Sequence, residues 1–205
     1  MVLFLFVSLL AAGQGLKTLT LPKPQTTGGK PLMQALSERK TTRSFSEEKI
    51  APQMLSNLLW AADGINRADG RRTAPSPHNS QEIDVYVMTA EGAYLYDARR
   101  HALQPVAAGD SRHLAGTQDF VARAPLNLVF VADFARMSGM PDPEKTKFSA
   151  ASAGFIGQNV YLFGASEGLG VVVRGSLEHS ALAKLLKLRP EQHIVLAQTV
   201  GYPKK

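Results

Sequence analysis

The sequence contains no cysteine among its 205 residues. Disulfide bonds and thiolate metal sites are therefore excluded. A chain without thiols suits an oxidising compartment, but this absence alone does not assign one. The five histidines show neither an HExxH motif nor a paired spacing, so each is interpreted as a surface or hydrogen-bonded histidine and no metal site is expected.

The N-terminal segment is apolar, but it is too short to span a membrane. Apolar residues run from Val2 to Ala12 with only Ser8 between them, about eleven positions, whereas a membrane helix needs about 20. This length fits the apolar core of a secretory signal, although the usual basic residues before it are missing. We therefore predict a signal peptide at residues 1–15, export to the periplasm and no stable membrane insertion. The alternative is a buried N-terminal element in a cytoplasmic protein.

Composition indicates one globular domain with a basic N-terminal quarter. Hydrophobic residues make up 44% and charged residues 20%, which allows a single domain with a real core. The net charge is +6, and residues 16–50 hold seven Lys or Arg against three Glu. Such a stretch suits nucleic acid, lipid or a small phosphate ligand, or it is simply a solvated surface. Because no heptad, zinc spacing or RNP-like aromatic run is present, we expect no nucleic-acid partner.

Hydrophobic periodicity predicts an α+β fold. Residues 16–30 carry Pro, Thr and Gly without a period and predict an extended arm. One helix is expected to open at Pro31, and a second to run from Pro52 to a C-terminal Gly64. Strands are expected at 83–89, 92–97, 103–106, 126–132, 171–173 and 193–202, helices at 112–123, 148–167 and 179–188, and irregular loops at 64–80 and 133–147. Helices and strands mix without strict βαβ alternation.

The expected helix at 148–167 is rich in small residues, including Gly154, Gly157 and Gly164. A glycine inside a helix costs about 1 kcal/mol. Three of them indicate close packing against another backbone, which belongs either to the core or to a partner subunit.

Two motif matches in this region have the wrong context. Gly168-Leu169-Gly170 begins like a dinucleotide fingerprint, but it lacks the third glycine and follows a helix. Residues 164–168 match G-x-S-x-G, but a nucleophile elbow needs a strand before the serine. Both matches are interpreted as fortuitous.

Three other stretches carry groups suited to a ligand. Arg39 and Arg43 flank Thr41 and can offer bidentate donors to a phosphate, or form a solvated basic turn. Residues 75–81 present Asn and Gln, which can pair with the edge of a heterocycle or cap a helix. Residues 165–170 end a helix in glycines, which allow close approach to a flat ring or form an ordinary C-cap.

Together these stretches resemble the nitroreductase family of flavoproteins over about residues 31–205. The matches, in the family's order, are Arg39-Lys40-Thr41-x-Arg43-x-Phe45 with R-R-S-x-R-x-F, residues 75–81 with P-S-x-x-N-x-Q, Gln158 to Gly170 with the central helix and its E-G-x-G end, and Val200-Gly201-Tyr202-Pro203 with a terminal "GYP". Residues 58–67 and the expected hairpin resemble the branch that includes thiazoline and oxazoline peptide dehydrogenases.

The resemblance implies an α+β sandwich with a mixed, mainly antiparallel sheet, dimeric through long central helices, with FMN bound at the subunit interface. The residues implied in cofactor binding are Arg39, Lys40, Thr41, Arg43, Pro75, Ser76, Pro77, Asn79, Gln81, Glu167, Gly168 and Lys204. Residues 39–43 are implied at the phosphate, the ribityl chain and ring atoms N1 and O2. The 75–81 loop is implied at the ring edge of the other subunit's flavin, and Glu167 and Gly168 at N5, with a backbone N–H as donor.

The implied activity is ping-pong electron transfer from NAD(P)H or another donor to a small acceptor such as a nitro compound or quinone. The flavin carries the chemistry, so no catalytic side chain is required. The alternatives are dehydrogenation of a specific substrate such as a peptide azoline, or a flavin-binding module without turnover. Few basic residues, Lys204 and Lys205, follow "GYP" here, and Arg174 is either a substitute phosphate ligand or a surface charge.

Overall fold

The computed structural model describes residues 15–204. All but the last residue of the predicted signal peptide lies outside the described residues, as does Lys205. None of the helices within residues 15–204 is both long and apolar enough to cross a membrane.

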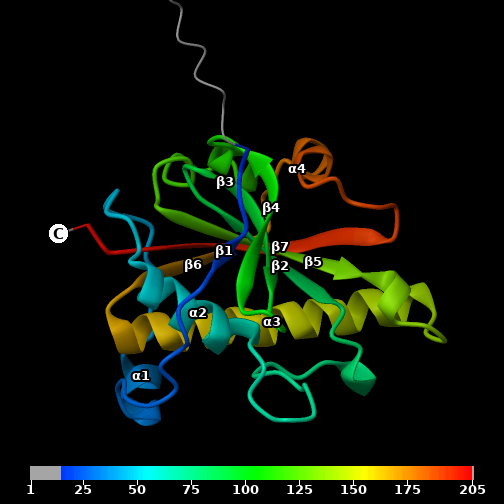
Figure 1. The fold of residues 1–205 in the computed structure, drawn as a ribbon, viewed down its shortest axis with the longest axis horizontal. Coiled ribbons are helices and arrows are strands. Elements are labelled where there is room, and N and C mark those ends of the chain that lie inside the picture. Colours follow the sequence, from blue (N-terminus) through cyan, green and yellow to red (C-terminus); the bar gives the residue numbers. More distant parts are fainter. Residues whose placement is uncertain (1–14, 205) are drawn as a thin grey trace, which may run out of the picture.

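One seven-stranded sheet forms the centre of the protein (Figure 1). Its order is β1-β4-β3-β2-β5-β7-β6, and all its neighbouring strands are antiparallel. The strands are β1 Leu19–Thr20, β2 Ile83–Met88, β3 Gly92–Asp97, β4 Ala102–Ala108, β5 Leu126–Asp133, β6 Gly170–Arg174 and β7 Gln192–Gly201. The mixed α+β class and the mainly antiparallel sheet are thereby confirmed.

Both faces of the sheet are covered, as Figure 1 shows. Helices α2 Pro52–Asp63 and α3 Asp142–Glu167 cover one face, α4 His179–Leu185 covers the other, and the short α1 Leu32–Glu38 packs on α3. Strand β5 is buried along its whole length because alternate residues enter different cores. Phe130 faces the core shared with α2 and α3, whereas Val131 faces the core shared with α4.

Two local predictions were wrong. Residues 112–123 are not a helix, because a 3₁₀ turn at Arg112–Ala115 is followed by further turns. Helix α3 begins at Asp142, so the expected irregular loop 133–147 contains its first residues. The two prolines, Pro141 and Pro143, fall where a helix needs no backbone donor. The prediction that α2 ends at Gly64 is confirmed, and Gly64 has φ −77°.

The glycines of α3 have different neighbours. A Cβ at Gly157 would lie 3.3 Å from Nε2 of Gln198, and one at Gly164 would lie 2.7 Å from Cγ2 of Val171. These two glycines therefore bring α3 close to its own sheet. Only Gly154 is exposed and would meet nothing within 4 Å. Of the two explanations for close packing, the core accounts for Gly157 and Gly164.

The arm at residues 16–30 is extended and fixed to the domain. Leu19 pairs with Leu103 of β4, and the N–H of Leu21 donates to the carbonyl of His101 at 3.1 Å. The hydroxyl of Ser56 on α2 donates to the carbonyl of Pro22 at 2.6 Å. The arm thus runs from the sheet edge along α2, and Lys30 at its end reaches the last turn of α3.

Candidate functional site

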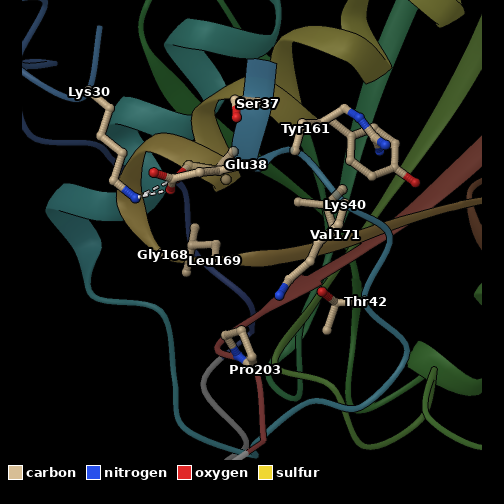
Figure 2. A pocket seen from close by; sticks show the side chains of 13 residues that line it. Lys30, Ser37, Glu38, Lys40, Thr42, Tyr161, Gly168, Leu169, Val171 and Pro203 are labelled. Atoms are coloured by element: carbon tan, nitrogen blue, oxygen red, sulfur yellow. Dashed lines mark hydrogen bonds and ion pairs between the residues drawn. The ribbon is translucent and has the colours of Figure 1, made fainter. Parts of the chain in front are cut away.

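A cavity of about 450 Å³ lies where the C-terminal end of α3 meets the chain after α1. Figure 2 shows the Lys30–Glu38 pair at one side of it and Thr42 and Pro203 at the other. The lining comes from the end of the arm, α1, the following segment, α3, β6 and the C-terminus: Lys30, Ser37, Glu38, Arg39, Lys40, Thr42, Tyr161, Gly164, Ala165, Gly168, Leu169, Val171 and Pro203.

The segment after α1 is held beside the sheet like an additional strand. The N–H of Thr42 donates to the carbonyl of Val171 at 3.0 Å, and Phe45 forms an isolated bridge with Pro203. The N–H of Lys204 donates to the carbonyl of Ser44 at 3.0 Å. The N-terminal basic motif and the "GYP" ending, far apart in the sequence, therefore lie side by side.

Tyr161 on α3 is a site residue that sequence reasoning missed. Its hydroxyl lies 3.2 Å from Oγ1 of Thr41 and accepts a hydrogen bond from the N–H of Val173 at 3.0 Å. The guanidinium carbon of Arg39 lies 5.3 Å from the centre of the Tyr161 ring, within the range of a cation–π contact. Tyr161 thus joins the basic motif to α3 and β6. Tyr161 is spaced from Gly164, Ala165 and Gly168 in the i, i+3, i+4, i+7 pattern of one helix face. This spacing was the sequence signal that could have placed Tyr161 at the site.

Helix α3 ends at the cavity in a left-handed glycine. Gly168 has φ 77° and ψ 19°, a conformation that glycine adopts without strain. The N–H groups of Gly168 and Leu169 both donate to the carbonyl of Gly164. The N–H of Gly168 is therefore engaged in the helix cap. The carboxylate of Glu167 accepts a hydrogen bond from the hydroxyl of Ser166 at 2.7 Å.

The 75–81 loop lies elsewhere in the protomer. It contains a 3₁₀ turn at Pro77–Asn79, and none of its residues is among those that line the cavity. In Figure 1 it lies below α3, away from α1 and from the end of α3. His78, Asn79 and Gln81 have φ of 49°, 55° and 48°, so the loop turns sharply through the left-handed region. Pro75, Ser76, Pro77, Asn79 and Gln81 thus do not meet the basic motif within one chain.

Gln81 organises its own loop. Its Nε2 donates to the carbonyl of Gly70 at 3.0 Å, and its Oε1 accepts from Nε of Arg72 at 3.2 Å. Arg72 also pairs with the buried carboxylate of Asp63 on α2. Burial raises the pKa of Asp63 to about 7, and the charge of Arg72 opposes that rise. Both ends of the Gln81 amide are therefore used inside the loop, whereas the sequence suggested recognition of a ligand.

The other predicted residues divide into three groups. Arg39, Lys40 and Gly168 line the cavity, and Thr41 is joined to it through Tyr161. The side chains of Arg43, Glu167 and Lys204 are not among the lining residues.

Both sequence interpretations of Arg174 are corrected. Arg174 is buried. Its guanidinium donates hydrogen bonds to the carbonyl of Ala115 and to Oδ1 of Asn127, the latter at 3.0 Å. Burial lowers the pKa of Arg174 to about 10. Arg174 is therefore a core residue, neither a surface charge nor a ligand in the cavity.

The charge of the cavity fits an anion. Its lining holds the cations Lys30, Arg39 and Lys40 against one carboxylate, that of Glu38. Guanidinium and ammonium groups are the usual partners of a phosphate. Within residues 15–204 no group of His, Asp or Glu is arranged to hold a metal ion.

Comparison with known proteins gives matches along most of the chain. The model described as Nitroreductase family matches residues 36–202. A candidate nitroreductase of Methanocaldococcus jannaschii is 27% identical over 180 residues, which cover 83% of this chain and 90% of that protein. The crystal structure of a candidate nitroreductase from Ralstonia eutropha is 46% identical, with a TM-score of 0.89, over 95% of this chain and 93% of that one.

Two further solved structures share the fold at lower identity. The microcin synthetase McbBCD complex of E. coli with truncated pro-MccB17 bound has a TM-score of 0.72 at 20% identity, over 99% of this chain and 85% of that one. The NADPH:FMN oxidoreductase of Vibrio harveyi complexed with NAD⁺ has a TM-score of 0.63 at 21% identity, over 85% and 69%. The match to the family model and the Ralstonia structure, together with the motifs gathered around the cavity, show that this chain belongs to the nitroreductase family.

Proposed function

We propose that this oxidoreductase binds FMN and transfers electrons through it by a ping-pong mechanism. The observation that carries the proposal is the basic cavity, in which the segment after α1 meets the end of α3. When bound, the flavin takes electrons from a reduced donor and passes them to an acceptor, so no side chain has to act as acid or base. A shared fold with an NADPH:FMN oxidoreductase adds support.

The roles proposed for the residues follow from their positions. Arg39 and Lys40 bind the phosphate, and Tyr161 orients Thr41 beside them through its hydroxyl. Arg43 follows on the same segment and is exposed, so its charge is available to a reduced flavin ring. Glu167 and Gly168 lie at the end of α3, where the ring is proposed to lie. Lys204, next to the cavity-lining Pro203, adds positive charge near the phosphate.

The site is proposed to be completed by a second copy of the chain. On α1, Leu32, Met33 and Leu36 are 63%, 76% and 43% exposed, and Phe155 on α3 is 48% exposed. Large apolar side chains exposed on adjoining helices are typical of a protein–protein interface. A homodimer through these helices would let the partner's 75–81 loop, which lies away from its own cavity, reach this one. Ser76, Pro77 and Asn79 are the residues proposed to contact the ring edge.

The donor and the acceptor are proposed by chemical class only. NAD(P)H is the proposed donor, and a nitro compound or quinone the acceptor. The second candidate is dehydrogenation of a peptide azoline, which the shared fold with a peptide-bound microcin synthetase complex favours. A flavin-binding module without turnover is the third. We also propose that the mature protein is exported and begins between residues 14 and 17, where the apolar N-terminal segment gives way to the arm.

Purified protein tests the function directly. Bound FMN gives a yellow protein that releases the flavin on denaturation. Oxidation of NADPH with a nitroaromatic acceptor supports the leading proposal. Turnover with an azoline-containing peptide but not with a nitroaromatic supports azoline dehydrogenation. Bound flavin that no acceptor reoxidises supports a flavin-binding module without turnover. A colourless protein that does not respond to added FMN would contradict all three.

A further inference from the structure

Lys30 at the end of the N-terminal arm reaches the basic cavity from outside the recognised motifs. Its ammonium lies 2.5 Å from Oε2 of Glu38 and donates to the carbonyl of Ala165 at 3.1 Å. Figure 2 shows both Lys30 and Glu38 directed toward one side of the cavity. The cavity thus has one cation supplied by the arm and two, Arg39 and Lys40, supplied by the segment after α1.

The backbone of the arm is fixed at this point, so the position of Lys30 is set by the fold. The N–H of Lys30 donates to the hydroxyl of Ser166 at 2.9 Å. Gly29, with φ +76°, approaches the same side chain so closely that a Cβ would lie 2.6 Å from Oγ of Ser166. This approach requires glycine both sterically and conformationally. The arm therefore carries the Lys30 side chain to the last turn of α3.

The Lys30–Glu38 pair is suited to exchange its partner. The two side chains are 35% and 41% exposed, and ion pairs that open to solvent contribute little free energy. A phosphate group carries between one and two negative charges at neutral pH and offers several acceptor oxygens. An ammonium group can therefore leave a single exposed carboxylate for a phosphate at small cost.

We propose that Lys30 is a cofactor-binding residue, whose ammonium leaves Glu38 for the phosphate of the flavin nucleotide, and that Glu38 competes with that phosphate. This proposal rests on the function proposed above, because it takes FMN as the ligand of the cavity. It gives the arm a part in cofactor binding. It also adds a third cation to Arg39 and Lys40 in the cavity.

Binding of FMN and of riboflavin, which lacks the phosphate, separates this role from a structural one. Loss of one charge-assisted hydrogen bond corresponds to about a tenfold change in affinity. Lys30→Met should weaken FMN binding about tenfold and leave riboflavin binding unchanged, while Lys30→Arg should keep most of the FMN affinity. Lys17→Met is the matched control, because Lys17 is an exposed lysine of the same arm that does not line the cavity. It should bind FMN as the wild type does.

Glu38→Gln tests the competition. It removes the carboxylate that holds Lys30 and should tighten FMN binding several-fold without changing riboflavin binding. Weaker FMN binding by this variant would overturn the competition. Equal FMN affinity in Lys30→Met and wild type would overturn the role of Lys30, and so would an equal loss for FMN and riboflavin. A wild-type protein that binds no FMN would instead remove the proposed function itself, so the two failures are distinguishable.

Discussion

The hydroxyl of Tyr161 lies 3.2 Å from Oγ1 of Thr41 and also accepts a hydrogen bond from the N–H of Val173. One phenol thus connects the basic motif, the long helix and the edge strand β6. We expect Tyr161→Phe to lower the free energy of unfolding by about 1 kcal/mol, because two hydrogen bonds lose their common partner. FMN binding should weaken as Thr41 loses its orientation.

Tyr94→Phe is a suitable control for this change. Tyr94 is also buried, and among the described residues its hydroxyl has no side-chain hydrogen-bond partner. Urea unfolding and FMN titration of both variants provide the comparison. If Tyr161→Phe matched the wild type in both measurements, the link through Tyr161 would have no role in the site.

Arg43 and Arg39 should have separable effects on the flavin. A positive charge near N1 and O2 stabilises the reduced, anionic ring more than the oxidised ring. We expect Arg43→Ala to lower the two-electron potential by about 30 mV, which corresponds to about 1.4 kcal/mol. Arg39→Ala should weaken both redox states equally and leave the potential unchanged. Spectroscopic redox titration measures the potential of each variant. Equal potentials in Arg43→Ala and wild type would show that Arg43 does not lie beside the flavin ring.

The exposed apolar surface predicts a dimer through α1 and α3. Phe155→Glu places a charge on this surface and should convert the dimer to monomer while weakening FMN binding, since each site would lose the partner's loop. Leu19→Glu is the control, because Leu19 is similarly exposed but lies on the edge strand β1. Sedimentation analysis gives the oligomeric state. A Phe155→Glu monomer with full FMN affinity would show that the partner contributes nothing to the site.

The expectation for Gly157→Leu follows from its position against the sheet. Its side chain would enter the space occupied by Gln198, whose Nε2 donates to the Gly157 carbonyl at 2.9 Å. We expect this variant to unfold at lower urea concentration because the protomer core is disrupted. If Gly157→Leu kept normal stability and lost only its ability to dimerise, the position of Gly157 against its own sheet would be contradicted.

Asp63 should make stability depend on pH in an unusual direction for a carboxylate. Its pKa is about 7 in the folded protein and near 3.8 when unfolded, so the folded state holds the proton more tightly. Stability from this group is therefore fully present below pH 4 and is lost as pH rises toward 7. The difference in unfolding free energy between Asp63→Asn and wild type should change between pH 5 and pH 7.5. A constant difference would mean that Asp63 is already ionised at pH 5.

Much of the fold was predictable from the sequence because its core strands carry dense apolar patterns. Residues 126–132 read correctly as a buried strand, since both faces of β5 are covered. Residues 112–123 were misread because their apolar side chains reach the core from turns, where helical periodicity has no meaning. The start of α3 was missed because two prolines resembled a loop.

The site was only partly predictable, since sequence motifs carry residue types but not tertiary paths. Arg39, Lys40 and Gly168 were identified because they belong to contiguous motifs. Lys30 was not, because its link to Ser166 joins positions 136 residues apart. Gln81 was assigned to the ligand on its chemistry and on the resemblance of its loop, whereas both ends of its amide serve the loop.

The cavity between α1 and α3 is proposed to bind FMN through its phosphate, and equilibrium titration of the apoprotein with FMN tests this most directly. Wild type should bind FMN stoichiometrically, one per chain. Arg39→Ala should bind about tenfold more weakly, as expected for loss of one charged phosphate ligand. Arg99→Ala, an exposed arginine away from this cavity, should bind as the wild type does. Equal FMN affinity in Arg39→Ala and wild type, or no binding by the wild type, would contradict the account.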